Sequence, residues 1–225
     1  MSQEQKNVFK DPESLTKWTK WSLYAQVFIS IVALISNILE YQLFSDFQNG
    51  VYTSHELAFA AAQSSDARQG VVGMVQFFIL LISGILILKW IYRANYNARQ
   101  LGASEMMFTP GWSIGWYFIP IANLWKPYQA MKEIWRASYN PQSWRSQTVP
   151  SLLAWWWSFW IVSNILANAS FRLAKRAEEF NEILAANVVA QLSDVTAIPL
   201  SLIFIGIITR IHAMQVSYAK ANQSI

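Results

Sequence analysis

The sequence predicts an all-α fold, a polytopic membrane helical bundle that forms a single membrane domain over residues 1–225. The chain is 54% hydrophobic and 13% charged, and this charged share is about half of that in a typical soluble domain. Its apolar residues gather in runs of about 20 or more, the length needed to cross about 30 Å of hydrocarbon. Most Lys and Arg residues flank those runs, a pattern typical of membrane topology.

Four spans are predicted, at about 21–44, 71–91, 151–171 and 190–211. The first contains one charge, Glu40, near its end, and the only charge of the second is Lys89, whose long side chain can reach the interface. The third follows Pro150 and contains no charge. The fourth carries Asp194 in its first turns and Pro199, where a helix can kink.

Two short helices are expected outside these spans. Thr53 and Glu56 have the spacing of a capping box, and the Ala-rich stretch 57–63 after them predicts a short helix in the loop between the first two spans. The stretch 173–184 has Lys175 and Glu179 four positions apart, which indicates an amphipathic helix before the last span.

The uncharged segment Met106 to Trp125 is long enough to cross the membrane, so two topologies compete. If it does not cross, thirteen of the 17 Lys and Arg residues lie on one side, whereas crossing divides them ten to seven. The positive-inside rule favours four spans with both termini in the cytoplasm. In that topology all 12 Trp residues lie on the cytoplasmic side or in the cytoplasmic halves of spans.

Prolines break this segment into an element at about 109–139 that is expected to be re-entrant or interfacial. Thr109 followed by Pro110 is typical of a helix start, and Pro120 should end that helix after about 10 residues. Asn123 could cap a second helix or bind exposed backbone, and Lys126 followed by Pro127 offers another start.

The second helix of the element is predicted to be amphipathic. One face carries Leu124, Tyr128, Met131, Trp135 and Tyr139, while Lys132 and Arg136 lie on another. Such a helix could lie in the interface, with its aromatic face at the acyl boundary and its cations among headgroups. Alternatively, the same face packs on the spans of the protein itself.

Three segments carry a resemblance to a known family. Residues 111–138, GWSIGWYFIPIANLWKPYQAMKEIWRAS, are similar to the signature of the domain-of-unknown-function 4328 family. The stretch 92–102, YRANYNARQLG, is similar to the segment after the second span of that family, and 155–166, WWWSFWIVSNIL, also fits. The resemblance implies a bacterial membrane protein and supplies no reaction, ligand or catalytic residue.

Catalytic and metal chemistry find little support in the sequence. There is no cysteine, and the two histidines, His55 and His212, are far apart, so neither a metal site nor a cofactor is expected. The chain contains no Gly-rich phosphate loop. We therefore expect no enzymatic activity, and no nucleic-acid binding, because the basic residues are explained by topology.

The residues expected to bind a ligand or lipid are polar, cationic or aromatic and lie on the predicted cytoplasmic side. They are Arg93, Asn95, Arg99, Trp116, Asn123, Trp125, Lys126, Lys132, Trp135 and Arg136. Asp194 and Glu40 lie toward the outer ends of their spans and are expected to reach headgroup water rather than mark a polar path. Expected partners are membrane lipids, above all anionic ones, and a second copy or another membrane protein.

The predicted function is that of a non-enzymatic sensor, scaffold or accessory subunit in the bacterial cytoplasmic (inner) membrane, which it crosses several times. Its Trp-rich basic cytoplasmic face would bind lipid headgroups or a partner. The alternative is a small oligomeric channel or transporter with a re-entrant helix at its permeation site.

Overall fold

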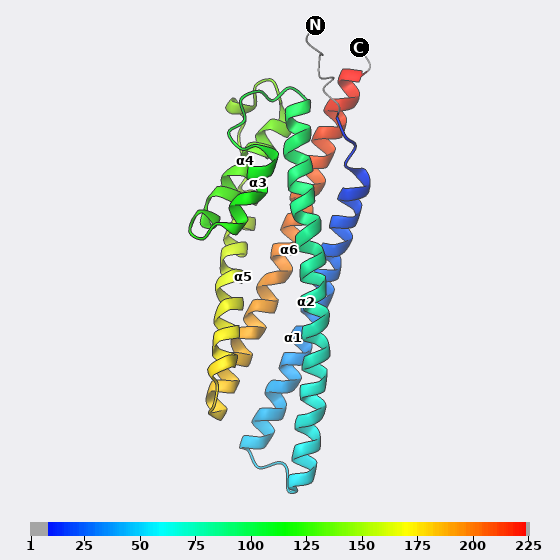
Figure 1. Ribbon diagram of the computed structural model, residues 1–225. Coiled ribbons are helices and arrows are strands. Elements are labelled where there is room, and N and C mark those ends of the chain that lie inside the picture. The colour runs from blue at the N-terminus through cyan, green and yellow to red at the C-terminus, as the bar shows by residue number, and fades with distance from the viewer. Residues whose placement is uncertain (1–8, 224–225) are drawn as a thin grey trace. The chain divides into compact units, whose positions relative to one another are not determined.

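The computed structural model describes residues 9–223, and these residues form helices and loops without a β-strand. The helices are α1 (Glu13–Gln48), α2 (His55–Gln100), α3 (Pro110–Gly115), α4 (Lys126–Tyr139), α5 (Ser151–Arg176) and α6 (Phe180–Gln223), with short 3-10 helices η1 (Trp116–Phe118), η2 (Ala122–Leu124) and η3 (Trp144–Ser146) (Figure 1). The predicted all-α class is confirmed.

Three helices, α1, α2 and α6, are long and apolar enough to cross a membrane. They contain the predicted spans at 21–44, 71–91 and 190–211. Helix α5 contains the predicted span at 151–171 and is 26 residues long, but it is not among the described helices that are apolar enough over 18 residues. The span in α5 therefore stays a prediction.

Two predicted short helices differ from the structure. The stretch 57–63 is part of the continuous helix α2, because nothing between it and the second span breaks a helix; Ser54, not Thr53, caps it by accepting the N–H of Glu56 at 3.2 Å. The predicted helix 173–184 is divided, since α5 ends at Arg176 and α6 begins at Phe180. The carboxylate of Glu182 accepts backbone N–H groups at this break.

The chain divides into two compact units. Unit 1 contains residues 9–22, 83–157 and 203–223, and unit 2 contains 23–82 and 158–202. Helices α1, α2 and α6 each contribute residues to both units. The prediction of a single membrane domain stays a prediction.

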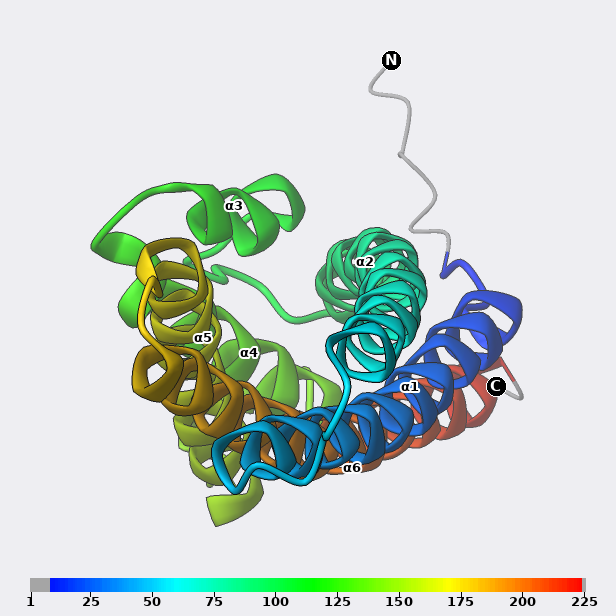
Figure 2. The same ribbon diagram turned by 90° about the horizontal axis from the view of Figure 1, so that it is seen from below.

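Unit 2 holds the short connection between α1 and α2 (Figure 2), where Gly50 has a φ of 67°. Phe44 of α1 packs edge-on against Phe180 at the start of α6, with 5.5 Å between ring centroids. Within unit 2, an aromatic contact therefore joins the last turns of α1 to the start of α6.

Unit 1 is organised around aromatic rings and the C-terminal part of α6. Phe204 stacks on Trp156 at 5.1 Å and meets the edge of Trp90 at 6.3 Å. The indole of Trp90 donates to the hydroxyl of Thr16, and that hydroxyl lies 3.3 Å from the ring of His212. These contacts connect the first turns of α1 to the C-terminal part of α6.

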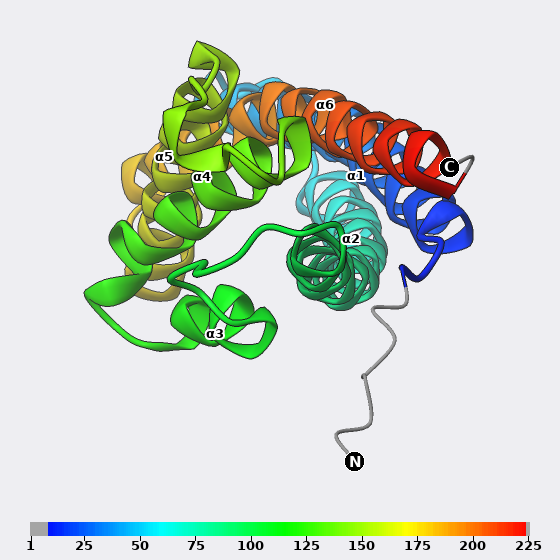
Figure 3. The ribbon, with the colours of Figure 1, turned by 90° about the horizontal axis from the view of Figure 1, so that it is seen from above.

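Helix α4 is fixed in unit 1 by a buried amide. Gln215 of α6 donates to the backbone oxygen of Ala94 at 2.8 Å and to the hydroxyl of Ser138 at 2.9 Å. One side chain thus joins α2, α4 and α6, and Figure 3 shows α4 beside the C-terminal part of α6.

Candidate functional site

The broken element begins and divides where the sequence predicts. Thr109 is the N-cap of α3, its hydroxyl accepting the N–H of Trp112 at 3.2 Å, and Pro110 opens the helix. The chain then tightens into η1 and turns after Pro120. Helix α4 starts at Lys126, with Pro127 in its first turn, and ends at Tyr139. Two helical pieces rather than one spanning helix therefore occupy this region.

The turn between the pieces has an unusual backbone. Ile121 has φ 67° and ψ −59°, and the N–H of Ala122 donates to the oxygen of Pro120 at 2.7 Å. This is a γ-turn of the rare type with positive φ, and a β-branched residue is strained in it. Such strain is found mainly where a segment has a functional role.

The strained turn carries a cluster of apolar side chains that the rest of unit 1 does not cover. Phe118 and Ile121 are each 72% exposed. Ile119, Leu124 and Trp125 next to them are also exposed. We call these five residues the apolar tip. Isolated exposed apolar residues are ordinary on proteins, but a contiguous group marks a surface for lipid or for a partner.

Cations and aromatic rings lie together near the tip. The ammonium of Lys126 is 5.6 Å from the ring centroid of Trp116 and 5.8 Å from that of Phe108. Lys132 lies 5.1 Å from the ring of Tyr128, which stacks on Trp157 at 6.1 Å. The predicted residues Trp116 and Lys126 are therefore in contact, as expected for an interfacial surface rich in Trp and Lys.

A second group of predicted residues bonds to the chain itself. Asn95 donates to the oxygen of Phe108 at 3.0 Å, and Arg99 donates to the oxygens of Met106 and Phe108, both at 2.8 Å. Arg99 also donates to the side-chain oxygen of Asn95 at 3.2 Å. Together they fix the connection between α2 and α3, so part of their hydrogen-bonding capacity serves the fold.

Glu133, which the sequence reasoning missed, completes this group. Its carboxylate accepts the backbone N–H groups of Met107 and Phe108. Burial is the largest influence on its pKa and raises it, although the two N–H groups and the charges of Arg99 and Arg145 act in the opposite direction. In the sequence, the only sign of this role is that Glu133 is an acidic residue on a helix whose other charged residues are cations.

The predicted aromatic face of α4 packs against the protein. Met131 and Trp135 are buried in unit 1, and only the ends of the face, Leu124 and Tyr139, are exposed. The placement of this face at the acyl boundary is therefore wrong, and packing on the protein itself is the correct alternative. Arg136 is half-buried, and its Nε has no hydrogen-bond partner among the described residues.

Asn123 does not cap the second helix. The N-cap position of α4 is Trp125, which makes no side-chain cap bond, and the residue range 122–124 forms η2. The buried Oδ1 of Asn123 has no partner within the described part of the chain. The neighbouring residue, Leu124, does make a contact: its carbonyl accepts the indole N–H of Trp157 at 2.9 Å. This contact ties the tip to the start of α5.

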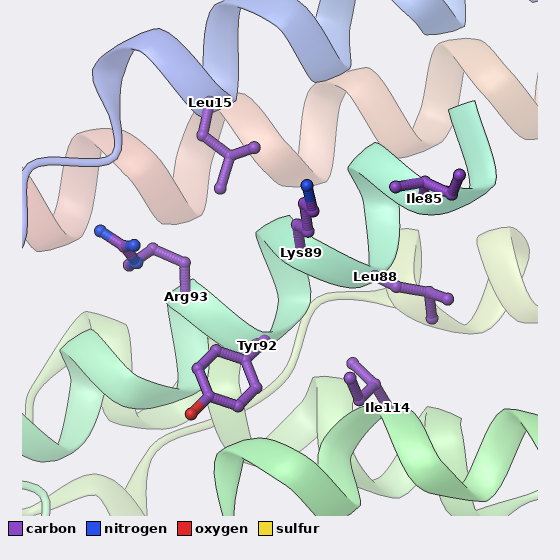
Figure 4. A pocket seen from close by; sticks show the side chains of 7 residues that line it. All are labelled: Leu15, Ile85, Leu88, Lys89, Tyr92, Arg93 and Ile114. Carbon is purple, nitrogen blue, oxygen red and sulfur yellow. The ribbon is translucent and has the colours of Figure 1, made fainter. Parts of the chain in front are cut away.

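Arg93 lies apart from these groups, in a cleft of unit 1. The cleft has a volume of about 660 Å³ and lies along one stripe of α2, from Ile85 through Lys89 to Arg93. Figure 4 shows Leu15 of α1 and Ile114 of α3 on opposite sides of this stripe. The sequence reasoning included Arg93 among the residues expected to bind a ligand or lipid, but it did not include Lys89, one turn earlier, which also lines the cleft.

Unit 2 contains a polar network among its apolar helices. Asp194 accepts the amide N–H groups of Asn37 and Gln76, both at 2.9 Å, and Gln69 donates to Asn37 at 3.1 Å. Asn187 donates to the carboxylate of Glu40 at 2.7 Å. Asp194 is buried, so the expectation that it simply reaches headgroup water is wrong.

Comparison with known proteins identifies the family of the chain. No significant match was found among curated proteins or among solved structures. A family model covers residues 53–213, which include the broken element, the cleft residues of α2 and α3, and Asp194. The chain therefore belongs to the family described as Domain of unknown function (DUF4328).

Proposed function

We propose that this chain is a non-enzymatic, multi-pass membrane protein that acts as a sensor, scaffold or accessory subunit through an apolar tip and adjacent cations that bind lipid. The observation that carries the proposal is the exposure of Phe118 and Ile121 at the strained turn. Apolar side chains and nearby Lys residues are the groups that bind an acyl boundary and its headgroups.

The contacts at the ends of the broken element support entry and exit on the same side of the membrane. Glu105, before the element, forms an ion pair of 2.8 Å with Arg145 after it. The indole of Trp144 donates to the oxygen of Ser104 at 3.0 Å. A segment that crossed the bilayer would separate these ends by about 30 Å. We therefore assign four spans, including α5, and a re-entrant or interfacial element.

The distribution of basic residues supports an orientation with both termini in the cytoplasm. Between residues 9 and 223, unit 1 contains twelve Lys and Arg residues and unit 2 contains four. Both ends of the described chain belong to unit 1. The positive-inside rule assigns such a unit to the cytoplasmic side, in a bacterial inner membrane as the family resemblance suggests.

Spin labels on the full-length protein in lipid nanodiscs test the tip. Single Cys substitutions at Phe118 and Ile121 can be labelled selectively because the native chain has no cysteine. Both labels should be protected from a water-soluble relaxation agent and accessible to oxygen. A label at Ser104, which is exposed outside the tip, is the control and should remain accessible to water. Equal water accessibility at all three positions would reject insertion.

A second candidate function is a small oligomeric channel or transporter. The polar network around Asp194 favours it, because ionisable groups within spans often mark ion or substrate pathways. Flux of monovalent cations into proteoliposomes, abolished by Asp194→Asn but not by Asn164→Ala, would establish this function. Equal flux in protein-free and protein-containing vesicles would reject it.

A further inference from the structure

The cleft of unit 1 is built from a single helical stripe of α2. Ile85, Leu88, Lys89, Tyr92 and Arg93 are spaced at i, i+3, i+4, i+7 and i+8, so they share one face. Leu15 and Ile114 complete the walls from α1 and α3 (Figure 4). Three helices thus form the cleft, and its volume of about 660 Å³ is in the range of small-molecule sites.

The chemistry of the cleft changes along the helix. Ile85 and Leu88 at one end are apolar, whereas Lys89, Tyr92 and Arg93 at the other carry two cations and a phenol hydroxyl. Residues 85 to 93 extend over about 12 Å at 1.5 Å per residue. The polar end coincides with the end of the apolar run 71–91, where a span reaches the headgroup zone. An amphiphile with an anionic head has the matching polarity.

Within the described part of the chain, the two cations of the cleft have no acidic partner. No carboxylate of residues 9–223 lies within ion-pair distance of Lys89 or Arg93. Lys89 is exposed and Arg93 is half-buried. Their helical spacing of four places both cations on one side of α2, where they can share the charge of one phosphate.

We propose that this cleft binds one anionic phospholipid, with Lys89 and Arg93 holding the phosphate and the walls formed by Leu15, Ile85, Leu88 and Ile114 holding the start of an acyl chain. The inference deepens the proposed lipid-binding function, on which it rests for the membrane context. Unlike the apolar tip, the proposed site is a discrete cleft on α2. Ile114 is the one lining residue that belongs to the broken element.

Native mass spectrometry of the full chain in detergent tests the site. Dioleoylphosphatidylglycerol should bind, dioleoylphosphatidylcholine should bind far more weakly, and soluble glycerol phosphate should not compete. Lys89→Gln with Arg93→Gln should weaken binding of the anionic lipid about 30-fold, or about 5-fold for each cation. Equal binding of the two lipids would overturn the headgroup assignment, and competition by glycerol phosphate would overturn the lipid as the source of the phosphate.

Two further variants test the cleft itself. Leu88→Trp retains both cations but fills the cleft, and it should also displace the lipid. Lys175→Gln with Arg176→Gln removes one Lys and one Arg charge from exposed positions of α5 outside the cleft and should leave phosphatidylglycerol binding unchanged. Unchanged binding in the Lys89 and Arg93 variant, or an equal loss in the Lys175 and Arg176 variant, overturns the site. Insertion of the tip is measured separately by its spin labels, so either proposal can fail alone.

Discussion

The carboxylate of Glu133 accepts the backbone N–H of Phe108 at 3.0 Å, although 25 positions separate the two residues. The acceptor lies on α4 and the donor lies just before α3, so the contact fixes one helical piece of the broken element to the other. The N–H of Met107 donates to the same carboxylate. One side chain of α4 therefore holds two successive residues of the segment that leads into α3.

The free energy of unfolding should depend on the protonation of Glu133, and therefore on pH. Burial, the largest influence, raises its pKa above the ordinary value of 4.5, so the folded protein holds the proton more strongly than the unfolded chain. The free energy of unfolding should therefore fall as pH rises from about 4.5 through the raised pKa, and stay level above it. Thermal unfolding in detergent across this range should show a larger fall in the native protein than in Glu133→Gln. Parallel pH profiles for the two proteins would contradict it.

Removal of the Asp194 carboxylate should destabilise unit 2. Asp194→Leu leaves the amides of Asn37 and Gln76 without their acceptor, and each interhelical bond is worth about 0.6 kcal/mol in a membrane. We expect a loss of about 1 kcal/mol in denaturant unfolding. Asp194→Asn, which keeps one acceptor, should lose less. Asn164→Ala is the control, since Asn164 is exposed and donates to Trp160 of its own helix; a loss as large as that of Asp194→Leu would reject the role of the network.

Glycine at the γ-turn should relieve strain. Ile121 has φ 67°, and a left-handed backbone costs an L-residue about 1–2 kcal/mol. Ile119→Gly is the matched control, because Ile119 has φ −100° and is unstrained there. Ile121→Gly should be more stable than Ile119→Gly by about 1–2 kcal/mol in thermal unfolding. Equal stabilities would mean that the turn carries no such strain.

Cysteine labelling should establish the topology. Ser104→Cys and Gln142→Cys flank the broken element and should react with a membrane-impermeant maleimide only from the cytoplasmic side. His55→Cys and Glu178→Cys should react only from the opposite side. All four positions are exposed, so protection reflects the membrane and not the fold. Opposite labelling of Ser104→Cys and Gln142→Cys would show that the element crosses.

The local signals of the sequence predicted the element boundaries well. Thr109 with Pro110 and Lys126 with Pro127 mark the starts of α3 and α4 as predicted. Each of these signals depends on the backbone of a few neighbouring residues, which is why a single sequence reveals it. Weak local signals were less reliable, since the Thr53 box did not start a separate helix.

Contacts between distant segments could not be predicted in the same way. The aromatic face of α4 suits a lipid surface and a protein surface equally, and only its packing in unit 1 decides between them. The network of Asp194 with Asn37 and Gln76 joins residues from three helices. The five α2 residues of the cleft share a visible helical spacing, but Leu15 and Ile114, which complete its walls, are far away in the chain.

Asn97, which is fully buried, donates to the carbonyl of Lys10 at 2.8 Å and accepts the N–H of the same residue at 3.2 Å. Both bonds involve only the main chain of position 10, so this pairing does not depend on the side chain there, although the ammonium of Lys10 also lies 5.2 Å from the ring centroid of Tyr96. The number of residues between position 10 and α1 is not free, because an insertion or deletion there would move the paired residue out of register. Natural variation between position 10 and Glu13 should accordingly appear as substitutions and not as changes in length.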